Sequence, residues 1–218
     1  MTFGFQSDEE TSIAVLDRAA EGGVTFLDTA DVYPLGGDLT TTGRTEEILG
    51  RWLAGKREQF VLATKCFGPM GTRRWDMGNS RRHIMDAVDA SLRRLQTDWI
   101  DLYQLHFADR STPIDETLSA LDDLVHAGKV RYIGCSNFLA YQLARAIGRS
   151  EARDFVRFES VQPRYNLIFR EFERLDQKIG TLLHRPCLSR KQPRGRARLG
   201  FRRRKATGGA AGRAARAA

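Results

Sequence analysis

The 218-residue sequence has little cysteine and no long apolar run. Its three cysteines, Cys66, Cys135 and Cys187, form no CxxC pair. Such sparse, unpaired cysteines are typical of a reducing compartment and give no zinc spacing, so we expect a cytoplasmic protein without a metal site. No stretch of 18 apolar residues is present, and we expect no membrane span. The first residues also lack a basic region followed by an apolar stretch, so no secretory signal is expected.

Acidic residues are missing from the last part of the chain. All 27 lie at or before Asp176, whereas 12 of the 35 Lys and Arg residues lie from His184 onward. Residues 1–183 therefore hold 23 basic residues against 27 acidic ones, although the net charge of the chain is +8. We expect the Arg/Gly/Ala-rich segment 184–218 to be a disordered basic tail. It could touch acidic surfaces non-specifically through its charge, without a specific nucleic-acid partner.

No GxGxxG motif follows any predicted strand, which argues against a Rossmann nucleotide site. Short apolar runs predict strands at residues 24–28, 60–65, 99–105, 130–134 and 158–162. Amphipathic spacing predicts helices at residues 7–21, 44–54, 80–95, 112–127, 139–147 and 170–183. Strict alternation of strands and helices indicates a parallel sheet with right-handed crossovers. This pattern alone is compatible with either a doubly wound sheet or an incomplete barrel.

Several polar residues are interpreted as ordinary parts of these helices. Ser7 and Glu10 form a capping-box pattern, and Thr112 before Pro113 is typical of an N-cap. Glu46 and Glu47 are taken as charges at a helix start, and His83 is taken as a surface residue without a role.

Three consecutive predicted strands end in a titratable side chain, namely Asp28, Lys65 and His106. Tyr33 follows the first of them by five residues. Each of these is usually a solvated strand end or a surface residue when it occurs alone. In a parallel barrel, however, the carboxyl ends of the strands meet on the face that carries the chemistry. We therefore expect these side chains to lie together.

Several stretches of the sequence resemble the aldo-keto reductases, which are NADPH-dependent enzymes built on a (β/α)8 barrel. One is Phe-Leu-Asp-Thr-Ala-Asp-Val-Tyr at 26–33, another is Ala-Thr-Lys at 63–65, and the rest lie at 43–50, 91–106, 128–138 and 161–166. The resemblance implies NADPH, in preference to NADH, and a small carbonyl substrate. It implies a catalytic tetrad and three cofactor contacts, on the following residues: Asp28, Tyr33, Lys65 and His106 for catalysis, and Ser136, Asn137 and Gln162 for the cofactor.

The chemistry of carbonyl reduction suits these residue types. Tyr33 can give a proton to the carbonyl oxygen, but an ordinary phenol has a pKa of about 10. A nearby Lys65 would lower that pKa, and Asp28 would hold Lys65 charged. His106 could donate a hydrogen bond to the substrate oxygen. The hydride has to come from a cofactor, because no side chain supplies one.

The resemblance covers most of residues 7–175 and leaves family strands one, seven and eight without counterparts. We expect residues 1–183 to form a partial barrel with about five of eight parallel strands. Its unpaired sheet edges predict a chain that aggregates or needs a partner. An alternative is a non-catalytic chain: a truncated or frameshifted family member, or a regulatory or binding subunit that keeps part of the fold.

Overall fold

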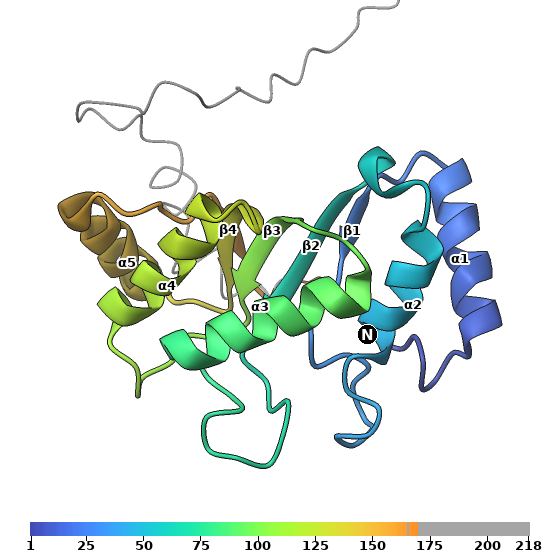
Figure 1. Cartoon of the computed structure of the whole chain (residues 1–218), viewed down its shortest axis with the longest axis horizontal. Helices are drawn as coiled ribbons and strands as arrows, with labels where there is room; N and C mark the ends of the chain where they lie inside the picture. The colour runs from blue at the N-terminus through green and yellow to red at the C-terminus, as the bar shows by residue number, and fades with distance from the viewer. Residues whose placement is uncertain (165, 170–218) are drawn as a thin grey trace, which may run out of the picture. The chain divides into compact units, whose positions relative to one another are not determined.

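Five parallel strands form a single sheet in the order β1-β2-β3-β4-β5. The computed structural model describes residues 1–164 and 166–169. The strands are β1 (Phe26–Asp28), β2 (Val61–Cys66), β3 (Ile100–Leu105), β4 (Val130–Ser136) and β5 (Ser160–Gln162). Neighbours in the sheet are also neighbours in the chain, whereas a doubly wound sheet reverses its strand order. The strands curl into half a barrel (Figure 1), which confirms the incomplete (β/α)8 type.

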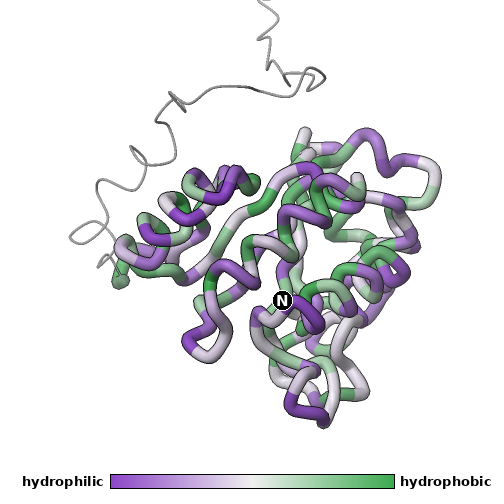
Figure 2. The backbone as a smooth tube through the Cα atoms, turned by 60° about the vertical axis from the view of Figure 1, so that its left-hand side comes forward, coloured by the Kyte–Doolittle hydropathy of each residue, from purple (hydrophilic) through white to green (hydrophobic). Residues whose placement is uncertain are grey.

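A helix follows almost every strand, as the sequence predicts. The helices are α1 (Glu9–Glu21), α2 (Arg44–Leu53), α3 (Arg81–Leu95), α4 (Ile114–His126) and α5 (Ala140–Arg153), with a short 3-10 turn η1 (Arg57–Gln59). Helices α2 to α5 pack side by side in chain order. Hydrophilic and hydrophobic residues alternate along them (Figure 2), as expected for helices with one face on a sheet.

Two expected helix caps are wrong, and one helix is longer than expected. Asp8 caps α1 instead of Ser7, because its carboxylate accepts the Thr11 amide at 2.8 Å. Pro113 occupies the N-cap of α4, while the Thr112 hydroxyl donates to Asp109 at 2.8 Å. Helix α5 continues to Arg153, beyond the expected end at residue 147.

The hydrophobic core lies between the sheet and the helices. Leu62, Tyr103 and Ile133 from the strands meet Ile84 of α3 and Leu121 of α4 in one buried cluster. The alternating side chains of each strand point to the opposite face. The core therefore fixes which residues are left to face the inside of the half-barrel.

Two polar helix residues are buried. This corrects the interpretation of His83 as a surface residue, whereas Glu46 does lie in the first turn of α2, as expected. Glu46 of α2 is fully buried, accepts the Thr64 hydroxyl at 2.6 Å and pairs with Arg94 of α3 at 2.7 Å. His83 is only 3% exposed. For Glu46, β2 and α3 cover a helix face that hydrophobic spacing alone marks as polar.

Some predictions fall on parts of the chain that the structure does not describe. The helix expected at 170–183 and the tail at 184–218 lie outside the described residues, so the division at residue 183 stays a prediction. Among the described residues, no helix is long and apolar enough to cross a membrane.

Candidate active site

An ion pair between Lys65 and Asp28 forms the centre of the candidate site. Strands β1 and β2 pair with Asp28 opposite Ala63, so that Lys65 lies one inward-facing position further along. The Lys65 ammonium donates to Asp28 Oδ2 at 2.6 Å and to the Thr29 carbonyl at 2.8 Å. Lys65 is 1% exposed, and its third N–H has no partner among the described residues. The buried Lys65 ammonium therefore has one N–H that can still donate to another group.

Tyr33 and His106 complete the predicted group of four. Their rings meet edge to face, with centroids 5.8 Å apart and an interplanar angle of 80°. The Lys65 Nζ lies 5.7 Å from the centre of the Tyr33 ring. The Tyr33 hydroxyl makes no hydrogen bond within the described part of the chain. The structure therefore brings together all four side chains that the sequence places at strand ends and on the following loop.

Burial shapes the electrostatics of these groups. It lowers the pKa of His106 to about 4, with help from the Lys65 charge, so the imidazole is neutral at pH 7. It also lowers the pKa of Lys65, although the hydrogen bond and charge of Asp28 counteract this effect. The pKa of Tyr33 is raised by burial and then by Asp28 and Asp31. The expectation that Lys65 lowers the pKa of Tyr33 is therefore wrong, because burial and the charges of Asp28 and Asp31 raise it.

The three residues expected to contact a cofactor lie on neighbouring strand ends. Ser136 is paired with Gln162 across β4 and β5, and its hydroxyl donates to the Gln162 carbonyl at 2.8 Å. Asn137 adopts a left-handed φ of 55° and donates from Nδ2 to the His106 carbonyl at 3.0 Å. Asparagine tolerates this backbone region better than most residues. The Gln162 Nε2 donates to Asp28 at 3.2 Å, which joins this group to the ion pair.

Sequence reasoning missed two residues of the site. Gln104 of β3 is opposite Lys65 in register, and its Nε2 donates to Asp28 Oδ1 at 3.0 Å. The signal was present, because residues 104 and 106 lie two apart on a strand and share a face. Asp31 is fully buried, and neither carboxyl oxygen has a hydrogen-bond partner within the described part of the chain. Its surroundings come from α2 and α3, so no local pattern reveals its burial.

Comparison with known proteins settles the family. The model of the aldo/keto reductase family matches residues 1–181. The chain belongs to this family. "Uncharacterized oxidoreductase YrpG" of Bacillus subtilis is 40% identical over 184 residues, covering 79% of this chain and 54% of the relative. "Aldo-keto reductase YhdN" of the same organism is 39% identical over 186 residues, covering 82% of this chain and 52% of the relative.

A fungal relative extends the comparison to a named reaction. "Versiconal hemiacetal acetate reductase" of Aspergillus parasiticus is 37% identical over 191 residues, covering 78% of this chain and 53% of the relative. The chain therefore spans about half the length of the curated relatives it matches. All three relatives carry the name of a reductase or an oxidoreductase.

The free polar atoms around Asn137 suit the carboxamide of a nicotinamide cofactor. The Asn137 Oδ1 and the Gln162 Oε1 accept no hydrogen bond from the described residues, and both side chains are exposed. Two free amide acceptors fit the amide donor of a carboxamide. In residues 1–164 and 166–169, no group of three or more His, Cys, Asp or Glu side chains could hold a metal ion.

Proposed function

We propose that the chain is an NADPH-dependent aldo-keto reductase, or the tetrad-bearing part of one, acting on small aldehydes or ketones. The observation that carries the proposal is the Lys65–Asp28 ion pair beside the edge-to-face rings of Tyr33 and His106. Family membership supports a reductase in general terms. The substrate class rests on the chemistry of the site and on the name of the fungal relative.

The roles follow from which groups hold protons. Tyr33 is neutral at pH 7, as any phenol with a pKa of about 10 or higher is, and its unpaired hydroxyl is free to donate to a carbonyl oxygen. His106 is also neutral there, so its ring can orient that oxygen by donating an uncharged hydrogen bond. Lys65, held by Asp28, compensates the negative charge that forms on Tyr33 after the proton leaves.

Ser136, Asn137 and Gln162 are proposed to hold the carboxamide end of the cofactor. When bound, the cofactor supplies the hydride that no side chain can supply. The chain itself orients the ring through the amide oxygens of Asn137 and Gln162. The bond from Asn137 to the His106 carbonyl keeps this carboxamide site in a fixed position relative to the tetrad.

A second candidate is a non-catalytic chain that keeps the fold. It is favoured by the raised pKa of Tyr33, because a higher pKa makes the phenol a weaker acid. In this case the tetrad would be retained as packing and the chain would act by binding.

The decisive experiment follows NADPH absorbance during reduction of an aromatic aldehyde by the purified chain. Tyr33→Phe should lower the turnover at least about 100-fold, since it removes the proton donor, and leave NADPH binding intact. Tyr132→Phe is the matched control, because it removes a hydroxyl from an exposed tyrosine on the same face of the sheet at a position outside the tetrad. Equal turnover by the wild type and Tyr33→Phe would refute the proposed role. NADPH binding without turnover by the wild type would favour the second candidate.

A further inference from the structure

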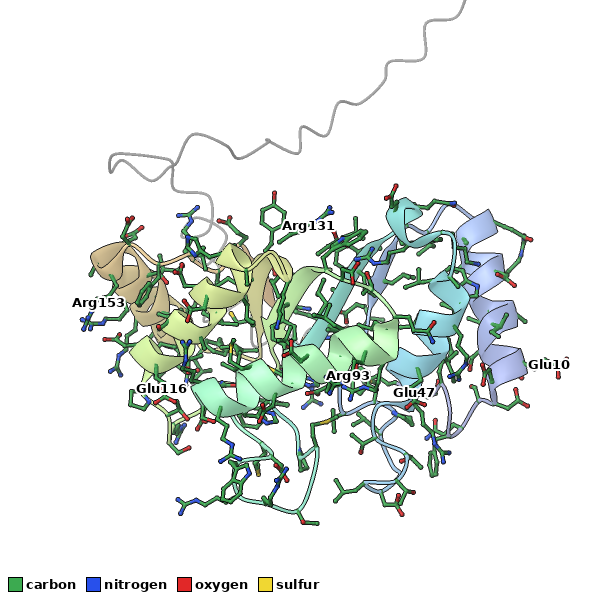
Figure 3. All side chains as sticks on the ribbon, viewed as in Figure 1. Glu10, Glu47, Arg93, Glu116, Arg131 and Arg153 are labelled. Atoms are coloured by element: carbon green, nitrogen blue, oxygen red, sulfur yellow. The ribbon has the colours of Figure 1, made fainter. Side chains whose placement is uncertain are left out.

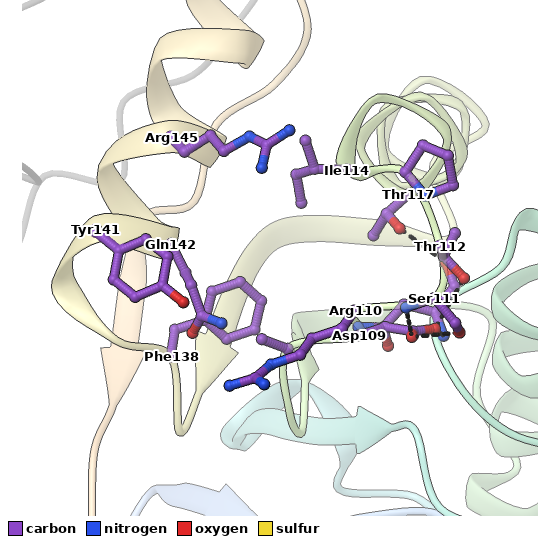
Figure 4. A pocket seen from close by; sticks show the side chains of 13 residues that line it. Asp109, Arg110, Ser111, Thr112, Ile114, Thr117, Phe138, Tyr141, Gln142 and Arg145 are labelled. Atoms are coloured by element: carbon purple, nitrogen blue, oxygen red, sulfur yellow. Dashed lines mark hydrogen bonds between the residues drawn. The ribbon is translucent and has the colours of Figure 1, made fainter.

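A cavity of about 700 Å³ opens between the β3–α4 loop and the first turns of α4 and α5 (Figure 4). It is lined by residues of the loop, such as Asp109 and Arg110, and by residues of α5, such as Tyr141 and Arg145. None of the tetrad or proposed cofactor residues lines it. The cavity therefore shares no residue with the candidate active site.

Two arginines reach this cavity without an ionic partner. Arg110 from the loop and Arg145 from α5 extend into the same space (Figure 4), and neither forms an ion pair or hydrogen bond with the described residues. By contrast, Arg149 and Arg153 of the same helix both pair with Asp115. Arg145 helps to lower the pKa of Asp115 but makes no direct contact with it. The cavity wall thus carries two cations whose charge the protein does not neutralise.

The acid in the cavity wall does not compete for these cations. Asp109 accepts hydrogen bonds from the Asn79 amide, from Ser111 and from the Thr112 hydroxyl. Burial acts to raise the pKa of Asp109, but these hydrogen bonds outweigh it and lower the pKa to about 2, so the carboxylate is charged. The formal charge of the titratable groups in the wall is one negative against two positive, which leaves an excess of positive charge at the arginines.

The cavity wall also contains unpaired hydrogen-bonding groups. Helices α4 and α5 begin at the N-caps Pro113 and Leu139, whose side chains have no acceptor for the first amides. Tyr141, 61% exposed, adds an aromatic surface and a hydroxyl at the rim.

We propose that this cavity binds a small organic oxyanion. The anionic group lies between Arg110 and Arg145. A phosphate ester and a hydroxycarboxylate share this chemistry. The proposal does not depend on the reductase function, because its residues and its test are separate from the tetrad.

The test is calorimetric titration of the full chain with glycerol 3-phosphate and, separately, with malate, at constant ionic strength. Saturable binding of at least one is expected, together with a higher melting temperature. Binding of the first alone identifies a phosphate site, and binding of the second alone a carboxylate site. Arg110→Gln and Arg145→Gln should each weaken binding about tenfold, because each removes a charge-assisted contact. Circular dichroism of each variant checks that the fold is kept.

Two controls separate this site from other cationic surfaces. Arg131→Gln removes the same charge near the opposite end of β4 (Figure 3) and should leave the affinity unchanged. Gln162→Ala disturbs the proposed cofactor contacts and should also have no effect. Absence of saturable binding by both probes at millimolar concentration would overturn the proposal. Binding that survives both arginine substitutions in the cavity would overturn it equally.

Discussion

At the scale of single residues, the most unusual group in the structure is the carboxyl of Asp31. It is fully buried between the tetrad and the Glu46–Arg94 pair. Burial and then the charge of Glu46 raise its pKa well above the usual value, and the charges of Arg94 and Lys65 offset only part of this. The folded chain therefore keeps a proton on Asp31 where an unfolded chain would release it.

Asp31→Asn should consequently change how stability depends on pH. The unfolded chain loses this proton near pH 3.9, so the stability of the wild type falls as pH rises from there towards the raised pKa of the folded state. The variant does not lose stability in this way. Its free energy of unfolding should therefore exceed that of the wild type by up to about 1.4 kcal/mol for each pH unit in that window.

Urea unfolding of both proteins across this pH window measures the effect. Asp86→Asn is the control, because the Asp86 side chain is 74% exposed. Parallel stability curves for the wild type and Asp31→Asn would show that Asp31 ionises normally in the folded chain.

The difference between Asp31 and the tetrad shows what the sequence could predict about the site. Asp28, Lys65 and His106 were predictable because each ends an apolar strand, and parallel strands bring their ends together. The burial of Asp31, in contrast, depends on how α2 and α3 pack, which no short pattern encodes. The raised pKa of Tyr33 was missed for a related reason, since the strength of desolvation depends on the assembled site.

At the scale of secondary-structure elements, a buried ion pair between Glu46 and Arg94 joins helices α2 and α3. Glu46 joins Arg94 of α3 to Thr64 of β2. Glu46→Gln removes the charge and leaves Arg94 without its partner, which should cost about 3–5 kcal/mol of stability. Glu47→Gln is the matched control, since Glu47 is the next residue and lies on the exposed face of α2 (Figure 3). Equal unfolding midpoints in urea for the two variants would contradict this account.

The same pair of helices also approaches closely at Gly50. A Cβ there would overlap the Arg94 carbonyl and lie 2.8 Å from the backbone carbon of Leu95. Gly50→Ala should destabilise the chain by about 1–3 kcal/mol through overpacking. Gly148 of α5 has nothing within 4 Å of such a Cβ, so Gly148→Ala should instead add about 0.5–1 kcal/mol. Thermal unfolding of both variants measures these two stability changes. A change in the same direction in both variants would contradict this account.

The order of the elements was largely predictable, and their packing was not. Apolar alternation and helical spacing report a local property, namely which residues face the core. The observed helix boundaries differ from the expected ones where another residue makes the capping hydrogen bond, as Asp8 does at the start of α1. The sequence also left open whether the sheet is doubly wound, because strand order depends on contacts between distant segments.

At the scale of the whole molecule, the described part of the sheet has two open edges and an exposed inner face. Strands β1 and β5 each pair on one side only within residues 1–164 and 166–169. Phe26, Val61 and Tyr132 are 51%, 38% and 40% exposed on the face opposite the helices. Open edges and exposed apolar strands favour association between chains.

We therefore expect the isolated chain to self-associate as its concentration rises. Sedimentation velocity over a range of concentrations measures this association. The double variant Phe26→Thr with Val61→Thr should weaken it, whereas Val15→Thr on α1, 50% exposed, should not. A sharp monomer boundary at every concentration would argue that the inner face and the edges are protected in solution.

The measurement that tests the account most directly is a fluorescence titration of the purified chain with NADPH. If five strands assemble a cofactor site, binding is saturable, and Asn137→Ala and Gln162→Ala each weaken it about 3- to 10-fold. Gln59→Ala, an exposed amide before β2, should bind as the wild type does. A folded chain that binds no NADPH, or that binds it equally well in all three variants, would contradict the proposed cofactor site.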